Sequence, residues 1–170
     1  MIRAAILNRV RETIQQIAVA QSTDPSELVF ILGPFSDLSK PLLIAVRDGL
    51  RSGFRYTAFL EDEFDLDIAL AIKCNVMAGL SKFILFVVTD EGVGRGWQVE
   101  LGDLLGEGRT NASKIGVYYE NLTHLPAPAR DIITNNPIRQ GPLVVHADQE
   151  RTVKALVTAV NTFFWEAEGG

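Results

Sequence analysis

The chain lacks several sequence features that mark common protein classes. Its 170 residues include one cysteine, Cys74, so no disulfide can form within the chain, which suits a reducing, cytoplasmic setting. No apolar run approaches the roughly 20 residues of a membrane span, so no membrane partner is expected. Acidic residues outnumber basic ones and the formal net charge is -5, which argues against nucleic acid as a partner.

Histidine is also scarce. The two histidines, His124 and His146, stand far apart in the sequence, and neither has a metal-ligating partner at a useful spacing. The sequence also lacks the serine-centred elbow of α/β hydrolases and the glycine-lysine phosphate loop of nucleotide hydrolases. We therefore predict no metal site, and any catalysis has to come from other side chains.

Apolar runs alternate with helical patterns along the whole chain. The predicted strands cover residues 28–32, 55–60, 83–89, 114–119 and 143–146, and amphipathic segments between them are predicted helices. One of these helices begins at residue 39 and is predicted to end at Gly53. Such alternation is typical of a parallel sheet with right-handed crossovers. The sequence thus predicts a three-layer α/β fold: a five-stranded, parallel, flavodoxin-like sheet in the order 2-1-3-4-5, with helices on both faces.

Residues 1–24 form a predicted N-terminal helix, and residues 25–170 form a single α/β nucleotide-binding-like domain. The apolar stripe of the helix consists of Ile6, Val10, Ile14 and Ile17, which recur at helical spacing. This stripe indicates that the helix packs either on the sheet or on a second subunit.

In an open sheet of this order, ligands bind at the carboxyl ends of the first and third strands, which lie side by side. The turn after the first strand supplies Gly33, Pro34, Phe35 and Asp37 as ligand-binding candidates, and Glu61 follows the second strand within an acidic cluster. Acidic residues at that place are also typical of a solvated loop that caps the next helix.

The glycine-rich segment after the third strand carries the strongest functional signal. Gly94 and Gly96 permit close approach of the backbone to a ligand, and Trp97 offers a ring on which a base could stack. Glu100 falls in the first turns of a helix, whose dipole favours an ionised carboxylate suited to chemistry at a cationic sugar carbon. The same residues are also typical of a plain loop, a core tryptophan and a dipole-stabilising glutamate. Asp90, which ends the third strand, either orients a sugar hydroxyl or caps the loop.

Short motifs in this chain resemble those of two related families. The run from Val29 to Phe35 resembles the opening strand and Gly-Pro-Phe turn of nucleoside 2-deoxyribosyltransferases and related deoxynucleoside-monophosphate N-glycosidases, and Glu100-Leu101-Gly102 resembles their Glu-x-Gly helix. Trp97-Gln98-Val99-Glu100-Leu101 resembles the Trp-x-x-Glu-Leu helix of Toll/interleukin-receptor-like (TIR-like) domains. The chain is also similar to uncharacterised archaeal proteins that place a helix before such a domain. It departs from the transferase pattern at Ser81-Lys82 and at Asp103.

The resemblance implies a nucleoside- or nucleotide-binding protein that cleaves or transfers an N-glycosidic (N-ribosyl) bond. It implies Glu100 as the catalytic carboxylate with Asp90 in support, no required cofactor, and NAD or a nucleotide as substrate or ligand. It also implies a homodimer or higher homo-oligomer. Two alternatives stay open: a non-catalytic, TIR-like nucleotide sensor or protein-interaction module, and a structural dimerisation domain that uses the N-terminal helix.

Overall fold

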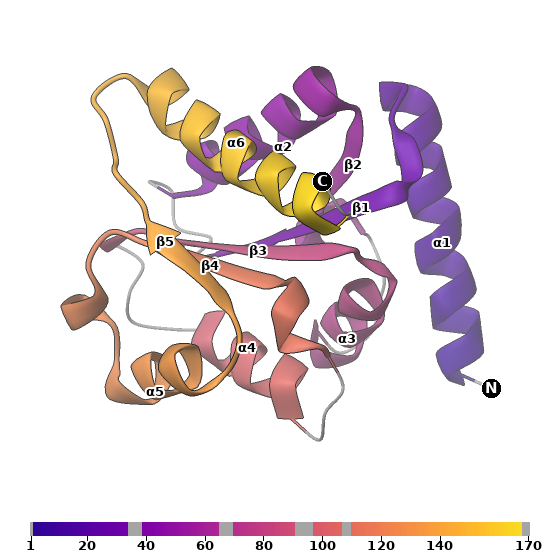
Figure 1. Cartoon of the computed structure of the whole chain (residues 1–170). Coiled ribbons are helices and arrows are strands. Elements are labelled where there is room, and N and C mark those ends of the chain that lie inside the picture. The colour runs from indigo at the N-terminus through magenta and orange to yellow at the C-terminus, as the bar shows by residue number, and fades with distance from the viewer. Residues whose placement is uncertain (1, 34–38, 65–69, 91–96, 107–109, 168–170) are drawn as a thin grey trace.

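The strands in the described part of the chain form one parallel sheet in the order β2-β1-β3-β4-β5 (Figure 1). The structure is a computed structural model, and it describes residues 2–33, 39–64, 70–90, 97–106 and 110–167. The strands are β1 (Asp24–Leu32), β2 (Tyr56–Leu60), β3 (Phe83–Val88), β4 (Ile115–Tyr119) and β5 (Arg139–Pro142). This arrangement confirms the predicted α/β fold and the predicted strand order.

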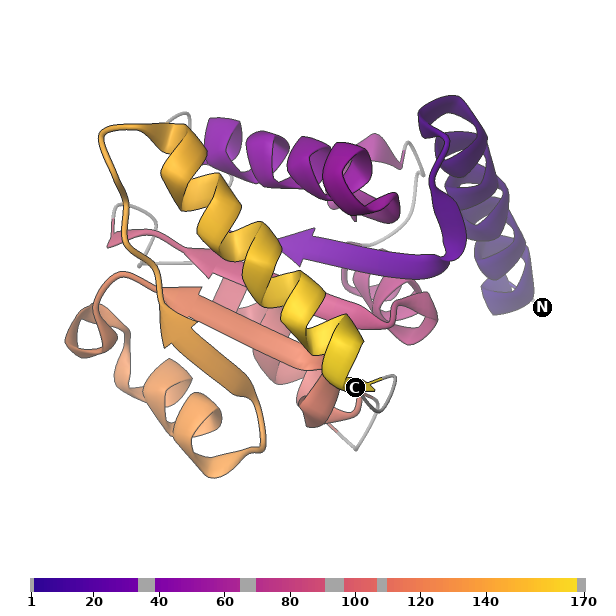
Figure 2. The same cartoon turned by 45° about the horizontal axis from the view of Figure 1, so that its top comes forward.

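Helices cover both faces of the sheet (Figures 1 and 2). One face carries α2 (Lys40–Phe54) and α6 (Gln149–Ala167), and the opposite face carries α3 (Leu70–Leu80), α4 (Trp97–Leu105) and α5 (Ala127–Asn135). Short 3-10 turns complete the connections: η1 (Glu61–Glu63), η4 (Ala112–Lys114) and η5 (Leu122–His124). Because β1 leads into α2 and β3 leads into α4, the connections that leave these two neighbouring strands run to opposite faces.

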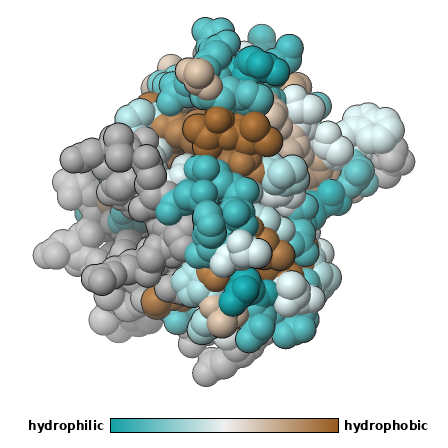
Figure 3. All heavy atoms as spheres, turned by 90° about the vertical axis from the view of Figure 1, so that its left-hand side faces the viewer, coloured by the Kyte–Doolittle hydropathy of each residue, from teal (hydrophilic) through white to brown (hydrophobic). Residues whose placement is uncertain are grey.

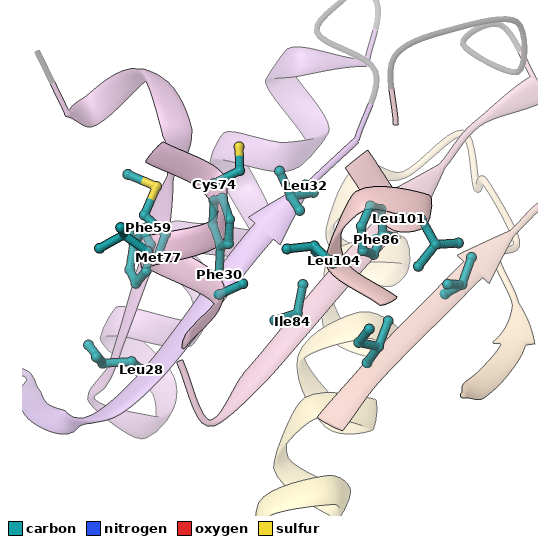
Figure 4. Close-up of a cluster of buried hydrophobic side chains, with 14 of the residues drawn as sticks. Leu28, Phe30, Leu32, Phe59, Cys74, Met77, Ile84, Phe86, Leu101 and Leu104 are labelled. Atoms are coloured by element: carbon teal, nitrogen blue, oxygen red, sulfur yellow. The ribbon is translucent and has the colours of Figure 1, made fainter. Parts of the chain in front are cut away.

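Alternate residues of β3 belong to two separate apolar clusters, one on each face of the sheet. Ile84 and Phe86 pack with Leu101 and Leu104 of α4 in the first cluster, which Figure 4 shows between the sheet and the helices. Phe83, Leu85 and Val87 lie in the second cluster, together with α2 and α6. A strand covered on both faces needs apolar residues at every position, which is why its sequence is a continuous apolar run.

The N-terminal helix α1 (Ile2–Gln21) packs on the sheet, which is one of the two arrangements that its stripe predicted. Ile6, Val10 and Ile14 are buried and belong to the same cluster as Phe30 of β1. The helix contacts α3, β1 and β2, and Figure 1 shows it standing at the β2 end of the sheet. It therefore shares a core with the rest of the described chain.

Helix α2 runs past Gly53, so the predicted stop at that glycine is wrong. The helix continues to Phe54 and ends on Arg55, which has a φ of 58° and donates its backbone N–H to Leu50 O. Arg55 O accepts the amide of Asp24 at 2.8 Å. The first residue of β1 thus holds a left-handed turn that glycine would adopt more readily.

The prediction of a strand over residues 143–146 is also wrong, because the fifth strand is β5, which precedes that run. Leu143 extends the pairing by one bond to β4 and buries its side chain. Beyond it, Thr152 Oγ1 of α6 donates to Val144 O at 3.2 Å and accepts from His146 N at 2.9 Å. The backbone of Val144 and His146 therefore bonds to a helix, and the pairing with β4 ends at Leu143.

The side chains of Arg51 and Glu63 bind backbone groups on the outer edge of β2. Arg51 is buried and donates from Nε to Ala58 O at 2.9 Å and from Nη2 to Glu63 Oε1 at 2.8 Å. Glu63 Oε2 accepts the backbone N–H of Leu60 at 2.8 Å, and Arg47 Nη1 lies 3.2 Å from Glu63 Oε1. Backbone groups of an edge strand are open to pairing with another chain unless they are satisfied in this way.

Lys114 closes the carboxyl end of α3. Its Nζ donates to Ala78 O at 2.8 Å and to Ser81 O at 2.9 Å, and a cation at that end of a helix also opposes the helix dipole. We expect Lys114→Met to lower the free energy of unfolding by about 1 to 2 kcal/mol at pH 7, measured by urea unfolding. Lys154→Met, on the exposed side of α6, is the matched control and is expected to change it by less than about 0.5 kcal/mol.

The effect of Lys114 depends on pH. Burial lowers the pKa of Lys114 below its ordinary value of 10.5, so the folded state releases this proton at a lower pH than the unfolded chain does. The unfolded chain then binds more protons, and the contribution of Lys114 to stability rises with pH towards 10.5. The difference in unfolding free energy between wild type and Lys114→Met is expected to grow between neutral and alkaline pH. A difference that shrinks would contradict this assignment.

Candidate functional site

The carboxyl edge of the sheet has a topological switch point between β1 and β3. These strands pair in register from Val29 with Phe83 to Leu32 with Phe86, and their connections leave towards opposite faces. The edge lies on the left in Figure 1 and faces the viewer in Figure 3, where brown apolar patches stand among teal polar side chains. In open α/β sheets, this geometry leaves a crevice between the diverging connections in which ligands bind.

Gly33 stands directly at this switch point. It follows the last residue of β1 and is buried, and a Cβ on it would lie 2.5 Å from the backbone oxygen of Val87 in β3. Any larger residue would force the ends of the two strands apart. The structure therefore places this predicted ligand-binding residue where the backbones of β1 and β3 come close together.

A buried hydrogen bond joins the two connections across the switch point. Ser39 Oγ and Thr89 Oγ1 lie 2.7 Å apart, and both residues are buried. Ser39 precedes α2, and its carbonyl accepts the amides of Leu42 and Leu43, but its hydroxyl makes no capping bond to that helix. The sequence signals a helix start at Ser39, and nothing in it signals the partner, which is fifty residues away.

Asp90 follows β3 and is anchored to the connection after β4. Its backbone N–H donates to Glu120 Oε1 at 3.1 Å, and its Oδ1 lies 3.2 Å from His124 Nδ1. Asn121 contacts the other ring nitrogen of His124, with Nδ2 and Nε2 3.5 Å apart. Sequence reasoning proposed Asp90 and missed Glu120 and His124, because the pairing depends on the path of two loops.

The acidic residues after β2 take mainly structural partners in the described chain. Glu61 opens η1 and is half-buried at the carboxyl edge, next to β1. Asp62 pairs with Lys40, and Glu63 turns back to the edge of β2. Glu61 directly follows β2, which places it on the flank of the switch point.

Glu100 and Trp97 lie in the first turn of α4, and the structure describes their backbone but not their side chains. Because α4 follows β3, its N-terminus is at the carboxyl edge, where the helix dipole favours negative charge. Leu101 and Leu104 are buried against the sheet, whereas Val99 is 62% exposed. The remaining predicted site residues, Pro34, Phe35, Asp37, Gly94 and Gly96, lie outside the described residues.

Two further observations concern metal binding and the extent of the site. Within the described ranges, no group of three or more histidine, cysteine, aspartate or glutamate side chains could hold a metal ion. A groove of about 460 Å³ lies between α2 and α6, with Ala45, Gly49, Val153 and Val157 among its lining residues. None of the predicted site residues that the structure describes lines this groove, so it is separate from the switch point.

Comparisons with protein-family models, with curated proteins and with solved structures give no significant match. Among the helices of the described residues, none is long and apolar enough to cross a membrane. The functional argument therefore rests on the geometry of the carboxyl edge and on the chemistry of the residues there.

Proposed function

We propose that this protein binds a nucleoside or nucleotide at the carboxyl edge of the sheet and cleaves or transfers its N-glycosidic bond, with Glu100 as the catalytic carboxylate. The observation that carries the proposal is the switch point between β1 and β3, which has the first turn of α4 on the same edge. Ligand sites of open α/β sheets occur at this place. The resemblance of the Glu-x-Gly and Trp-x-x-Glu-Leu motifs supports the choice of bond.

Each residue at the edge has its own role in the proposed reaction. Gly33 keeps the end of β1 close to β3, because a Cβ there would lie 2.5 Å from the backbone oxygen of Val87. The N-terminus of α4 favours the ionised form of Glu100, and an ionised carboxylate stabilises the positive charge that forms on the sugar carbon when the base departs. Water then completes hydrolysis, or a second base completes transfer. Asp90 follows β3 and lies on the same edge of the sheet.

The direct test is base release. The protein is incubated with NAD, with deoxynucleosides and with their monophosphates, and free base is measured by chromatography. We expect release by the wild type, and we expect Glu100→Gln to reduce it by about 100-fold or more, a barrier change of roughly 2.7 kcal/mol. The matched control is Asp103→Asn, which removes a charge from the exposed side of the same helix and is expected to keep the rate.

Ligand binding is tested separately by thermal unfolding. A ligand at about 100 times its Kd stabilises the folded state by about 2.7 kcal/mol, which raises the Tm by roughly 5 to 10 °C for a chain of this size. A Tm rise without base release would support a nucleotide sensor in place of an enzyme. A Tm that no ligand in the panel changes, together with no release, would overturn the proposal and leave a structural role.

A further inference from the structure

His124 and Asp90 form a hydrogen-bonded pair at the rim of the carboxyl edge. His124 Nδ1 lies 3.2 Å from Asp90 Oδ1, and the side chains are 55% and 38% exposed. Asp90 comes from the end of β3, and His124 closes η5 after β4, so two neighbouring strands bring the pair together. Glu120 is the other carboxylate of this cluster, and it binds the amide of Asp90 and not the imidazole.

The surrounding hydrogen bonds decide which ring nitrogen carries the proton. Asn121 Oδ1 accepts from Thr123 N at 3.0 Å and from Thr123 Oγ1 at 2.7 Å, which fixes the orientation of the Asn121 amide. The Asn121 Nδ2 group, a donor, therefore faces His124 Nε2, which has to accept. The neutral imidazole then carries its proton on Nδ1 and donates it to Asp90.

This arrangement leaves Nε2 as the basic atom of an oriented imidazole. A proton that binds at Nε2 displaces the Asn121 amide and makes an imidazolium, whose charge the adjacent Asp90 carboxylate stabilises. A carboxylate that fixes the tautomer of a histidine and stabilises its charged form is the common way in which proteins prepare a histidine for proton transfer. The His124 side chain is 55% exposed, so the ring is accessible from outside the protein.

We propose that His124, oriented by Asp90, is the catalytic acid that supplies a proton to the departing base; this step rests on the function proposed above. As the bond between the sugar carbon and the base nitrogen breaks, its electron pair moves to the base, which takes the proton from Nε2. Water then adds to the sugar carbon and returns a proton to Nε2. The balance is one nucleoside and one water converted to free sugar and free base, with His124 restored.

The test compares a base that needs a proton to leave with one that does not. A purine methylated at N7 is already cationic and departs as a neutral molecule, whereas an unmodified base needs protonation. We expect His124→Gln to slow release of the unmodified base about 100-fold, from whichever deoxynucleoside or monophosphate the wild type cleaves fastest. Release of N7-methylguanine from the methylated nucleotide is expected to change less than about threefold.

Two further variants complete the design. His146→Gln replaces the other histidine, which lies in the connection to α6, and is expected to leave both rates unchanged. Asp90→Asn, which removes the carboxylate and keeps a side chain of the same size, is expected to show the same selectivity for the unmodified base in weaker form. Asp90→Asn replaces His124→Gln as the test variant if His124→Gln proves unstable in thermal unfolding.

The outcomes separate this inference from the proposed function. Equal slowing of both bases by His124→Gln, or slowing of neither, would overturn the role of His124 while the Glu100→Gln result stands. Absence of release by the wild type from every compound of the panel, NAD included, would overturn the proposed cleavage, and the role of His124 with it. Release from NAD alone would overturn the role of His124 and leave the proposed function standing. Selective slowing of the unmodified base supports both.

Discussion

Arg51→Met is expected to lower the free energy of unfolding by about 3 kcal/mol, which is a large part of the stability of a typical domain. Arg51 satisfies Ala58 O and one oxygen of Glu63, whose other oxygen holds the amide of Leu60. Methionine fills a similar space and makes none of these bonds. The variant therefore leaves a partly buried carboxylate and a strand carbonyl without their main donor.

The free energy of unfolding is measured by chemical denaturation, with two independent probes that monitor the same transition. Arg47→Met is the matched control on the same helix, because Arg47 also lies near Glu63 Oε1, at 3.2 Å, whereas it is Arg51 that donates to the strand carbonyl of Ala58. We expect it to cost less than about 1 kcal/mol. Adding Glu63→Gln to Arg51→Met removes the stranded charge, and the double variant should lose less than the sum of the two single losses. Equal losses for the two arginine variants would contradict this account of the β2 edge.

Gly33→Ala is expected to lower the free energy of unfolding by about 2 to 3 kcal/mol. The new Cβ would lie 2.5 Å from Val87 O, a backbone atom that cannot rotate away, and 3.2 Å from a methyl group of Leu43. Overpacking of this kind displaces the backbone and costs stability. Because the displaced atoms form the switch point, the variant is also expected to reduce any Tm rise that a nucleotide produces.

Gly79→Ala provides the matched comparison. Gly79 lies in helix α3, and among the described residues no atom beyond its own helix backbone and chain neighbours lies within 4 Å of the position that a Cβ would take. The same substitution there should raise the free energy of unfolding by about 0.5 to 1 kcal/mol, because alanine loses less conformational freedom in a helix. Opposite signs at the two glycines are the expected result in urea unfolding. If Gly33→Ala leaves the free energy of unfolding unchanged, the ends of β1 and β3 are less closely packed than the 2.5 Å contact with Val87 O implies.

The fold was predictable because its central strands have a clear signal in the sequence, an apolar run without interruption. Every position of β3 is buried, so its sequence has no polar interruption, and alternation with amphipathic helices leaves few possible connections. The outermost strand was not predictable by the same signal. β5 has the sequence Arg-Gln-Gly-Pro with half its positions exposed, while the apolar run after it bonds to α6. Leu143 of that run is buried, whereas Val144 and Val145 are exposed, so an apolar run by itself indicates neither a strand nor full burial.

The candidate site was predictable in position and only partly in composition. The switch point follows from strand order, so Gly33 and Asp90 could be placed at the edge from the sequence alone. The pairs Ser39 with Thr89 and Asp90 with His124 could not, because they depend on the register of β1, β3 and β4 and on the paths of loops. Each residue on its own looks like an ordinary loop or cap residue.

The two apolar clusters have a consequence for the order in which the chain can fold as it is synthesised. On the α2 face, Tyr56 stacks on Phe164 with ring centroids 4.4 Å apart and donates its hydroxyl to Asn161. The strand that presents Tyr56 leaves the ribosome about a hundred residues before α6, which at 5–20 residues per second is a wait of roughly 5 to 20 seconds. Throughout that interval α2 is present on this face of the nascent sheet but α6 is not, whereas α1, made first, is already available to the other face. The demand on cellular chaperones therefore falls on the face that α6 closes last.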